Sequence, residues 1–181
     1  MANPEHEEPL DGFDRLTVRL YRSGIMISAA GVGLLAGLSA LHRPTEVAWL
    51  VCLAGVLLSA TNVHLYDRRV RWVISGSVSL GAVLWVAGLL LSARILQLAG
   101  LGFVFVSLSG FALKEQFCFR IPGLKLVPLG LAGGLLPLVF GSELGAAVVY
   151  GITVIPLGIL SLAKWRMPLH FDIGDKSRYQ I

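Results

Sequence analysis

The stretch WVISGSVSLGAVLWVAGLLLS, residues Trp72–Ser92, decides the fold class. It contains no Asp, Glu, Lys or Arg, and Arg71 and Arg94 lie just outside it. A helix needs about 20 apolar residues to cross the hydrocarbon core of a bilayer, which is roughly 30 Å thick. The stretch therefore predicts a transmembrane helix in an integral membrane protein.

Five other apolar segments have a similar character, and only short polar connections separate them. Hydrophobic residues make up 55% of the chain and charged residues 14%, whereas soluble domains have about 25% charged residues. Backbone polar groups in lipid must be satisfied within helices, so we predict an all-α bundle of six transmembrane helices. The other five segments are Gly24–Leu41, Val47–Tyr66, Ile95–Leu113, Val127–Phe140 and Leu144–Ala163.

The six spans divide the chain into three parts. Residues 1–23 are predicted to be a cytoplasmic segment, in which Leu10–Tyr21 forms a short amphipathic helix at the membrane interface. Residues 24–163 form the transmembrane domain, and residues 164–181 form a cytoplasmic tail. No small-residue cleavage pattern follows the first apolar segment, so we expect that segment to be retained rather than removed as a signal peptide.

The distribution of Lys and Arg predicts the orientation. Alternating spans place thirteen of the fifteen cations on one side and only Arg43 and Arg94 on the other. Cytoplasmic loops carry the excess of Lys and Arg, so both termini are predicted to be cytoplasmic, in a bacterial inner membrane. The thirteen are Arg15, Arg19, Arg22, Arg68, Arg69, Arg71, Lys114, Arg120, Lys125, Lys164, Arg166, Lys176 and Arg178. Because these cations are dispersed, we expect no nucleic-acid partner.

Small residues at four-residue spacing predict close helix packing. Ala29, Gly33 and Gly37 have this spacing in the first span, and Gly130 and Gly134 have it in the fifth. Such residues let helices approach closely in lipid. We favour packing within the bundle, with a homodimer face as the alternative.

The end of the second predicted span carries a candidate site. If the helix continues to its end, His64 and Asp67 lie three residues apart on one face. The carboxylate would then orient the imidazole and raise its pKa. One hypothesis is an axial ligand for a tetrapyrrole or a proton-handling group. The alternative, which we favour because there is no second ligand, is an interfacial histidine bonded to backbone or lipid.

A second candidate site follows the fourth predicted span. Lys114, Glu115 and Cys118 fall within one helical turn if that helix continues. A neighbouring ammonium group would lower the pKa of the thiol, which suggests nucleophilic chemistry. No base or acyl-binding site is apparent, so a helix end with an interfacial lysine and aromatic anchors is the preferred alternative.

The tail contains a third polar motif. Asp172 and Asp175 flank Gly174, but the further oxygen ligands of an EF-hand are absent from the sequence. We interpret the motif as a polar turn, and we predict no metal site. The sequence indicates no particular cofactor.

Together, these three motifs resemble a family of small integral membrane proteins known as domain of unknown function 2301, found largely in cyanobacteria. The resemblance is carried by Val63-His64-Leu65-Tyr66, by the block Lys114–Phe119 and by Asp172–Ser177. It implies a bacterial inner membrane, with a photosynthetic (thylakoid) membrane as one option, and it supplies no catalytic residue. Gln116 stands where the family is expected to have Ala, which leaves the role of the block open.

The leading functional hypothesis is a non-enzymatic accessory or assembly protein. Its cytoplasmic face would present a site to a partner, a small ligand or a larger membrane complex. The motive is that all the candidate residues are predicted to lie on one side: His64, Asp67, Lys114, Glu115, Cys118, Asp172 and Asp175. A small transporter or channel is the alternative, because Pro128, Pro137 and Pro156 could break helices around a site. A membrane enzyme using Cys118 or Glu115 is the third hypothesis.

Overall fold

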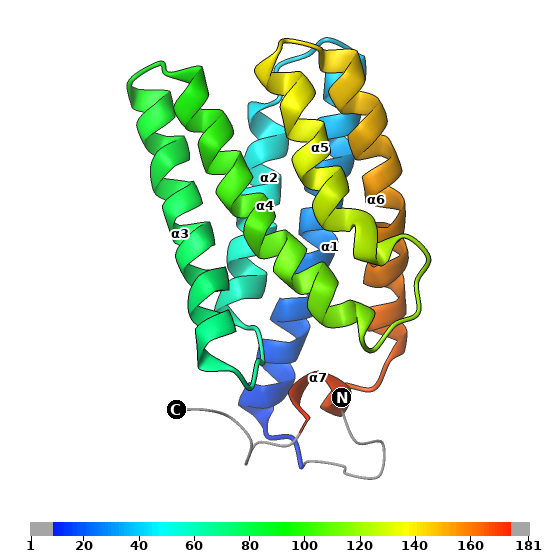
Figure 1. Cartoon of the computed structure of the whole chain (residues 1–181). Coiled ribbons are helices and arrows are strands. Elements are labelled where there is room, and N and C mark those ends of the chain that lie inside the picture. Colours follow the sequence, from blue (N-terminus) through cyan, green and yellow to red (C-terminus); the bar gives the residue numbers. More distant parts are fainter. Residues whose placement is uncertain (1–8, 175–181) are drawn as a thin grey trace.

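The computed structural model describes residues 9–174, which form helices and short connections without a strand. Six helices lie alongside one another and alternate in direction (Figure 1). Their bounds are α1 Gly12–Ala40, α2 Glu46–Thr61, α3 Arg68–Leu90, α4 Arg94–Gln116, α5 Val127–Val139 and α6 Glu143–Arg166. A short 3-10 helix, η1 (Leu124–Leu126), precedes α5, and a short helix, α7 (His170–Ile173), follows α6.

The two ends of the bundle differ. One end, which we call the α7 end, holds the start of α1, the connections 62–67 and 117–123, and α7 (Figure 1). The other, which we call the opposite end, holds the connections 41–45, 91–93 and 140–142. Within the described residues, Arg43 and Arg94 lie at the opposite end and every other Lys and Arg lies toward the α7 end.

Four of the helices are long and apolar enough to cross a membrane: α1, α3, α4 and α6. The other two apolar helices are shorter, at Glu46–Thr61 and Leu124–Val139. Each of the six predicted segments contains a helix, but length and composition identify only four of these helices within residues 9–174 as candidate spans. Large apolar side chains are exposed on the outer surface, including Val83 and Leu129, as expected where lipid rather than water surrounds a protein.

Two predicted boundaries were wrong. The segment Leu10–Tyr21 is not a separate helix, because α1 runs without a break from Gly12 to Ala40. Asp11 begins α1 with a capping box: its side chain accepts from the N–H of Asp14, whose side chain accepts in return from the N–H of Asp11. The second predicted span also ends early, since α2 stops at Thr61 and residues 62–67 form a connection.

Glycines bring helices together, but only some of the close contacts are at the glycines that the four-residue spacing had predicted. In α5, Gly134 packs against the Tyr150 ring of α6, where an added Cβ would lie 2.6 Å from Cζ. In α1 the close contact instead uses Gly31, whose added Cβ would lie 2.7 Å from the Cα of Cys52 in α2. A Cβ added at Gly37 would meet no atom of another helix within 4 Å. Close packing is therefore confirmed for α5, whereas α1 approaches α2 through other small residues.

Candidate functional site

Four charged side chains are buried together at the α7 end. Arg22 comes from α1, Glu115 from α4, Lys164 from α6 and Asp172 from α7, and each side chain is only 1–2% exposed. We call these four residues the buried ion cluster. Moving charges out of water is costly unless each finds an opposite charge and further hydrogen bonds. The cluster therefore depends on its pairing.

Arg22 binds the segment that follows α6. Its Nε donates to Oδ2 of Asp172 at 2.7 Å, and its Nη2 lies 2.6 Å from the same oxygen. Its remaining donors reach backbone carbonyl groups, with Nη1 2.7 Å from the oxygen of Met167 and Nη2 2.9 Å from that of Pro168. One guanidinium group thus holds both the connection after α6 and the side chain of α7.

Lys164 joins the two carboxylates. Its Nζ lies 3.0 Å from Oε2 of Glu115 and also donates to Oδ1 of Asp172. The other oxygen of Glu115, Oε1, accepts a hydrogen bond from the hydroxyl of Tyr21 at 2.7 Å. Helices α1, α4 and α6 and the short α7 are therefore connected through one continuous polar network.

The helical period explains why these charges are buried. Along α1, Val18, Arg22, Ile25 and Val32 are all buried and fall on one stripe of the helix. Lys164 lies on one stripe of α6 together with Leu157 and Leu160, and this stripe is also buried. The ends of these two stripes meet the end of α4, where Glu115 supplies the opposite charge.

A cavity of about 620 Å³ opens beside the cluster. Glu115, Lys164 and Asp172 contribute to its wall. Apolar side chains supply most of the remaining surface, including Leu113 and Phe117, both of which are exposed. The cavity thus combines an apolar wall with a charged region.

Among the described residues that line this cavity, Lys114 is the more accessible of the two lysines. Its side chain is 22% exposed, and its Nζ lies 3.3 Å from Oε1 of Glu115. The ammonium group also lies 4.6 Å from the centre of the Tyr21 ring, which favours a positive charge there. Counting Lys114, three cations face two carboxylates among residues 9–174, which gives the described part of the site an excess of positive charge.

Cys118 lines the same cavity, but its environment contradicts the predicted activation. The helix ends at Gln116, so Cys118 lies in the following connection, with its thiol exposed in part. Burial of the thiol, followed by the negative charge of Glu115, raises the pKa of Cys118 above its ordinary value; Lys114 and Lys164 oppose this effect without reversing it. The arrangement disfavours a thiolate nucleophile at neutral pH.

His64 and Asp67 are not arranged as predicted, because the helix that would have aligned them ends at Thr61. His64 lines the cavity, and its Nε2 lies 3.5 Å from Oγ1 of Thr17. Asp67 is exposed and is the N-cap of α3, since its Oδ1 accepts from the N–H of Arg69 at 2.7 Å. Asp67 is not among the residues that line the cavity.

The cavity brings together five of the candidate residues: His64, Lys114, Glu115, Cys118 and Asp172. Asp175 lies outside the described residues. Tyr21, Arg22 and Lys164 were not predicted as site residues, because the two cations were counted only as membrane-flanking charges. Their positions on apolar helical stripes were the signal that could have identified them.

Comparisons with known proteins place this architecture in a known group. The model of the family described as "Uncharacterized integral membrane protein (DUF2301)" matches residues 34–181. A protein of Haemophilus influenzae described as "Uncharacterized protein" is 34% identical over 187 residues, and the alignment covers 100% of both chains. The expected cyanobacterial origin gains no support from this relative. No solved structure matches the chain.

Proposed function

The chain belongs to the DUF2301 family of integral membrane proteins, and we propose that it binds a small anionic amphiphile in the cavity at the α7 end. The observation that carries this proposal is the combination of an apolar wall with an accessible ammonium group, that of Lys114, in one cavity. An apolar chain would cover the wall, and an anionic head group would approach Lys114. The role is non-enzymatic binding, either for its own sake or as part of a larger membrane assembly.

The charge balance favours an anionic ligand over a cationic one. Glu115 and Asp172 are each engaged by buried cations, so their charges are already matched. Lys114 shares Glu115 with Lys164 and remains partly exposed. An incoming anion would therefore complete the pairing of Lys114, whereas a cation would compete with buried ion pairs.

A transporter is less well supported. The argument for one rested on helix breaks at prolines, but Pro137 lies inside α5 and Pro156 lies inside α6, and neither helix is interrupted. Pro128 is in the first turn of α5, where a missing N–H costs little. A membrane enzyme is also less well supported, because the raised pKa of Cys118 disfavours its thiolate.

Photo-crosslinking tests the binding proposal. The full chain in nanodiscs would be exposed to a palmitate analogue that carries a diazirine, and crosslinked peptides would be mapped by mass spectrometry. We expect crosslinks at the cavity wall, and we expect excess oleate to suppress them. Oleyl alcohol, which has the same chain without the charge, should not suppress them. Lys114→Gln should weaken labelling about tenfold, because it removes one charge-assisted hydrogen bond to the ligand.

Lys125→Gln provides the matched control, because Lys125 is an exposed lysine at the same end and does not line the cavity. Its labelling should equal that of the wild type. Equal suppression by oleate and oleyl alcohol, or equal labelling of the two lysine variants, would reject an anionic ligand at this site.

We further propose that the chain crosses the inner membrane of a bacterium six times, with both termini in the cytoplasm. Helices α2 and η1–α5 each have about 24 Å of length at 1.5 Å per residue, which is short of the roughly 30 Å core. Both nevertheless lie between longer spans, and a bilayer thins locally around short helices. The concentration of Lys and Arg at the α7 end supports a cytoplasmic location for that end.

Cysteine accessibility tests this topology. The test uses a chain with Cys52→Ala and Cys118→Ser and adds single cysteines. Arg43→Cys lies before α2 and Arg69→Cys lies after it, in the first turn of α3, while Arg120→Cys and Ser142→Cys lie on either side of α5. A membrane-impermeant maleimide should label only positions 43 and 142 in intact cells. Labelling of both members of a pair would show that the helix between them does not cross, and labelling of positions 69 and 120 alone would reverse the orientation.

A further inference from the structure

Three helices begin at the opposite end of the bundle, and no side chain caps any of them. The N-cap residues are Thr45 for α2, Ala93 for α4 and Ser142 for α6, each without a side-chain hydrogen bond to its helix. The first N–H groups of a helix lack partners within it, and the helix dipole makes this end positive. Each of these three first turns therefore presents N–H groups without helical partners and a locally positive potential, while the C-termini of α1, α3 and α5 lie at the same end of the bundle.

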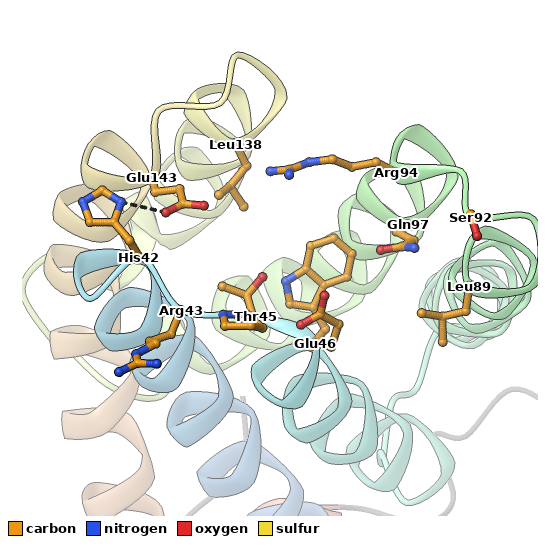
Figure 2. A pocket seen from close by; sticks show the side chains of 12 residues that line it. His42, Arg43, Thr45, Glu46, Leu89, Ser92, Arg94, Gln97, Leu138 and Glu143 are labelled. Atoms are coloured by element: carbon orange, nitrogen blue, oxygen red, sulfur yellow. Dashed lines mark hydrogen bonds and ion pairs between the residues drawn. The ribbon is translucent and has the colours of Figure 1, made fainter.

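These three first turns surround a cavity of about 630 Å³ (Figure 2). Glu46 and Trp49 contribute from α2, Arg94 and Gln97 from α4, and Glu143 from α6. The connection after α1 adds His42 and Arg43. The cavity is separate from the one at the α7 end, with which it shares no lining residue.

The two glutamates of this cavity lie at helix N-termini, and Glu143 is also paired with a histidine. Glu46 and Glu143 are each the first residue of a helix, where the dipole stabilises a negative charge, and Glu143 also lies 2.8 Å from Nδ1 of His42. Arg43 and Arg94 make no ion pair within residues 9–174. The guanidinium group of Arg94 extends over the cavity toward Leu138 and Glu143 (Figure 2).

Trp49 independently indicates a missing acceptor. The residue is 7% exposed and lines the cavity, and its indole Nε1 is buried with no hydrogen-bond partner in the described part of the chain. Buried donors in proteins are nearly always hydrogen-bonded. Because an indole N–H donates and cannot accept, the atom it needs is an acceptor such as the oxygen of an anion.

We propose that this cavity binds an oxyanion, either a free phosphate or carboxylate or the same group on a lipid head group. Arg94, which extends over the cavity (Figure 2), supplies the charge-assisted hydrogen bonds, the N–H groups of the helix first turns supply further donors, and Trp49 donates from within the wall. The site is independent of the proposed amphiphile site, because the two cavities lie at different ends and involve different residues.

Calorimetric titration of the purified full chain with inorganic phosphate, and separately with acetate, tests the proposal at fixed ionic strength. The lipid source is tested by native mass spectrometry after transfer from nanodiscs with and without phosphatidylglycerol. Saturable binding of phosphate or acetate, or retention of phosphatidylglycerol, is the expected result. Arg94→Gln and Trp49→Phe should each weaken binding about tenfold or more, since each removes one hydrogen bond to a charged group.

Arg69→Gln is the matched control, because it removes the same charge from an exposed position at the α7 end. Its affinity should equal that of the wild type. Circular dichroism and size-exclusion chromatography establish that the variants fold, and Trp49→Phe keeps an aromatic ring in the wall. Failure of the anions and of the lipid to bind, unchanged binding in both Arg94→Gln and Trp49→Phe, or equal loss in Arg69→Gln would overturn the proposal. Each of these outcomes would leave the amphiphile proposal standing, because crosslinking tests that proposal separately at the α7 end.

Discussion

Arg22 and Asp172 are 150 positions apart in the chain, yet Nε of the arginine lies 2.7 Å from Oδ2 of the aspartate. Both side chains are almost completely buried. The pair joins the first helix of the bundle to the segment after the last one. It thereby fixes the short helix α7 beside the cavity, which Asp172, Ile173 and Gly174 help to line.

We predict that Arg22→Gln destabilises the protein by about 3–5 kcal/mol, because Asp172 and two backbone carbonyl groups would lose buried partners. Thermal unfolding in detergent, with reversibility checked, measures the change. Arg19→Gln is the control, since Arg19 is exposed on the same helix. Equal unfolding temperatures for the two variants would show that the ion pair contributes nothing to stability.

We predict that Gly31→Ala destabilises the α1–α2 contact by about 1–3 kcal/mol, because the new methyl group would overlap the backbone of Cys52. Gly37→Ala should be neutral or slightly stabilising, since nothing lies within 4 Å of the added atom and alanine favours helices. Thermal unfolding of the two variants under one condition tests the difference. The reverse order of stability would contradict the α1–α2 packing.

We predict that Cys118 reacts more slowly with iodoacetamide at pH 7.5 than a free cysteine, because its raised pKa lowers the thiolate fraction. The rate should rise as the pH increases above neutrality. Mass spectrometry of the labelled peptide measures the rate, and Cys52, which is buried, serves as the internal control. Lys114→Gln should slow the reaction further, because it removes a cation that lowers this pKa. A rate that has already reached its plateau at neutral pH would contradict the assignment.

We predict that Asp67→Ala destabilises the protein by about 1 kcal/mol through the loss of the α3 N-cap. Asp67→Asn should cost much less, because asparagine caps almost as well. Hydrogen exchange at the first turn of α3 and thermal unfolding test this order. Neither variant should alter labelling by the palmitate analogue, and a tenfold change in Asp67→Asn would restore Asp67 as a site residue.

Much of the fold could be predicted because its causes are local. Each long apolar segment forms a helix whatever its neighbours are, since the backbone must satisfy its own hydrogen bonds in lipid. Boundaries were less predictable. Asn62 and His64 lie in a polar connection although the apolar pattern continues to Tyr66, because Asp67 caps a new helix just beyond them.

The sequence by itself determined the class of the protein, its helical segments and the concentration of cations toward one end. These follow from composition and from the positions of single residues along the chain. Only the tertiary structure decided that Arg22 and Lys164 are buried partners of Asp172 and Glu115 rather than solvated flanking charges. The reason is that an ion pair depends on which helix ends meet in space, and several other cations near the same helix ends could have been the partners as far as the sequence shows. Likewise, the first turns of three helices surround one cavity, with Trp49 and Arg94 in its lining, only because the bundle brings these turns together.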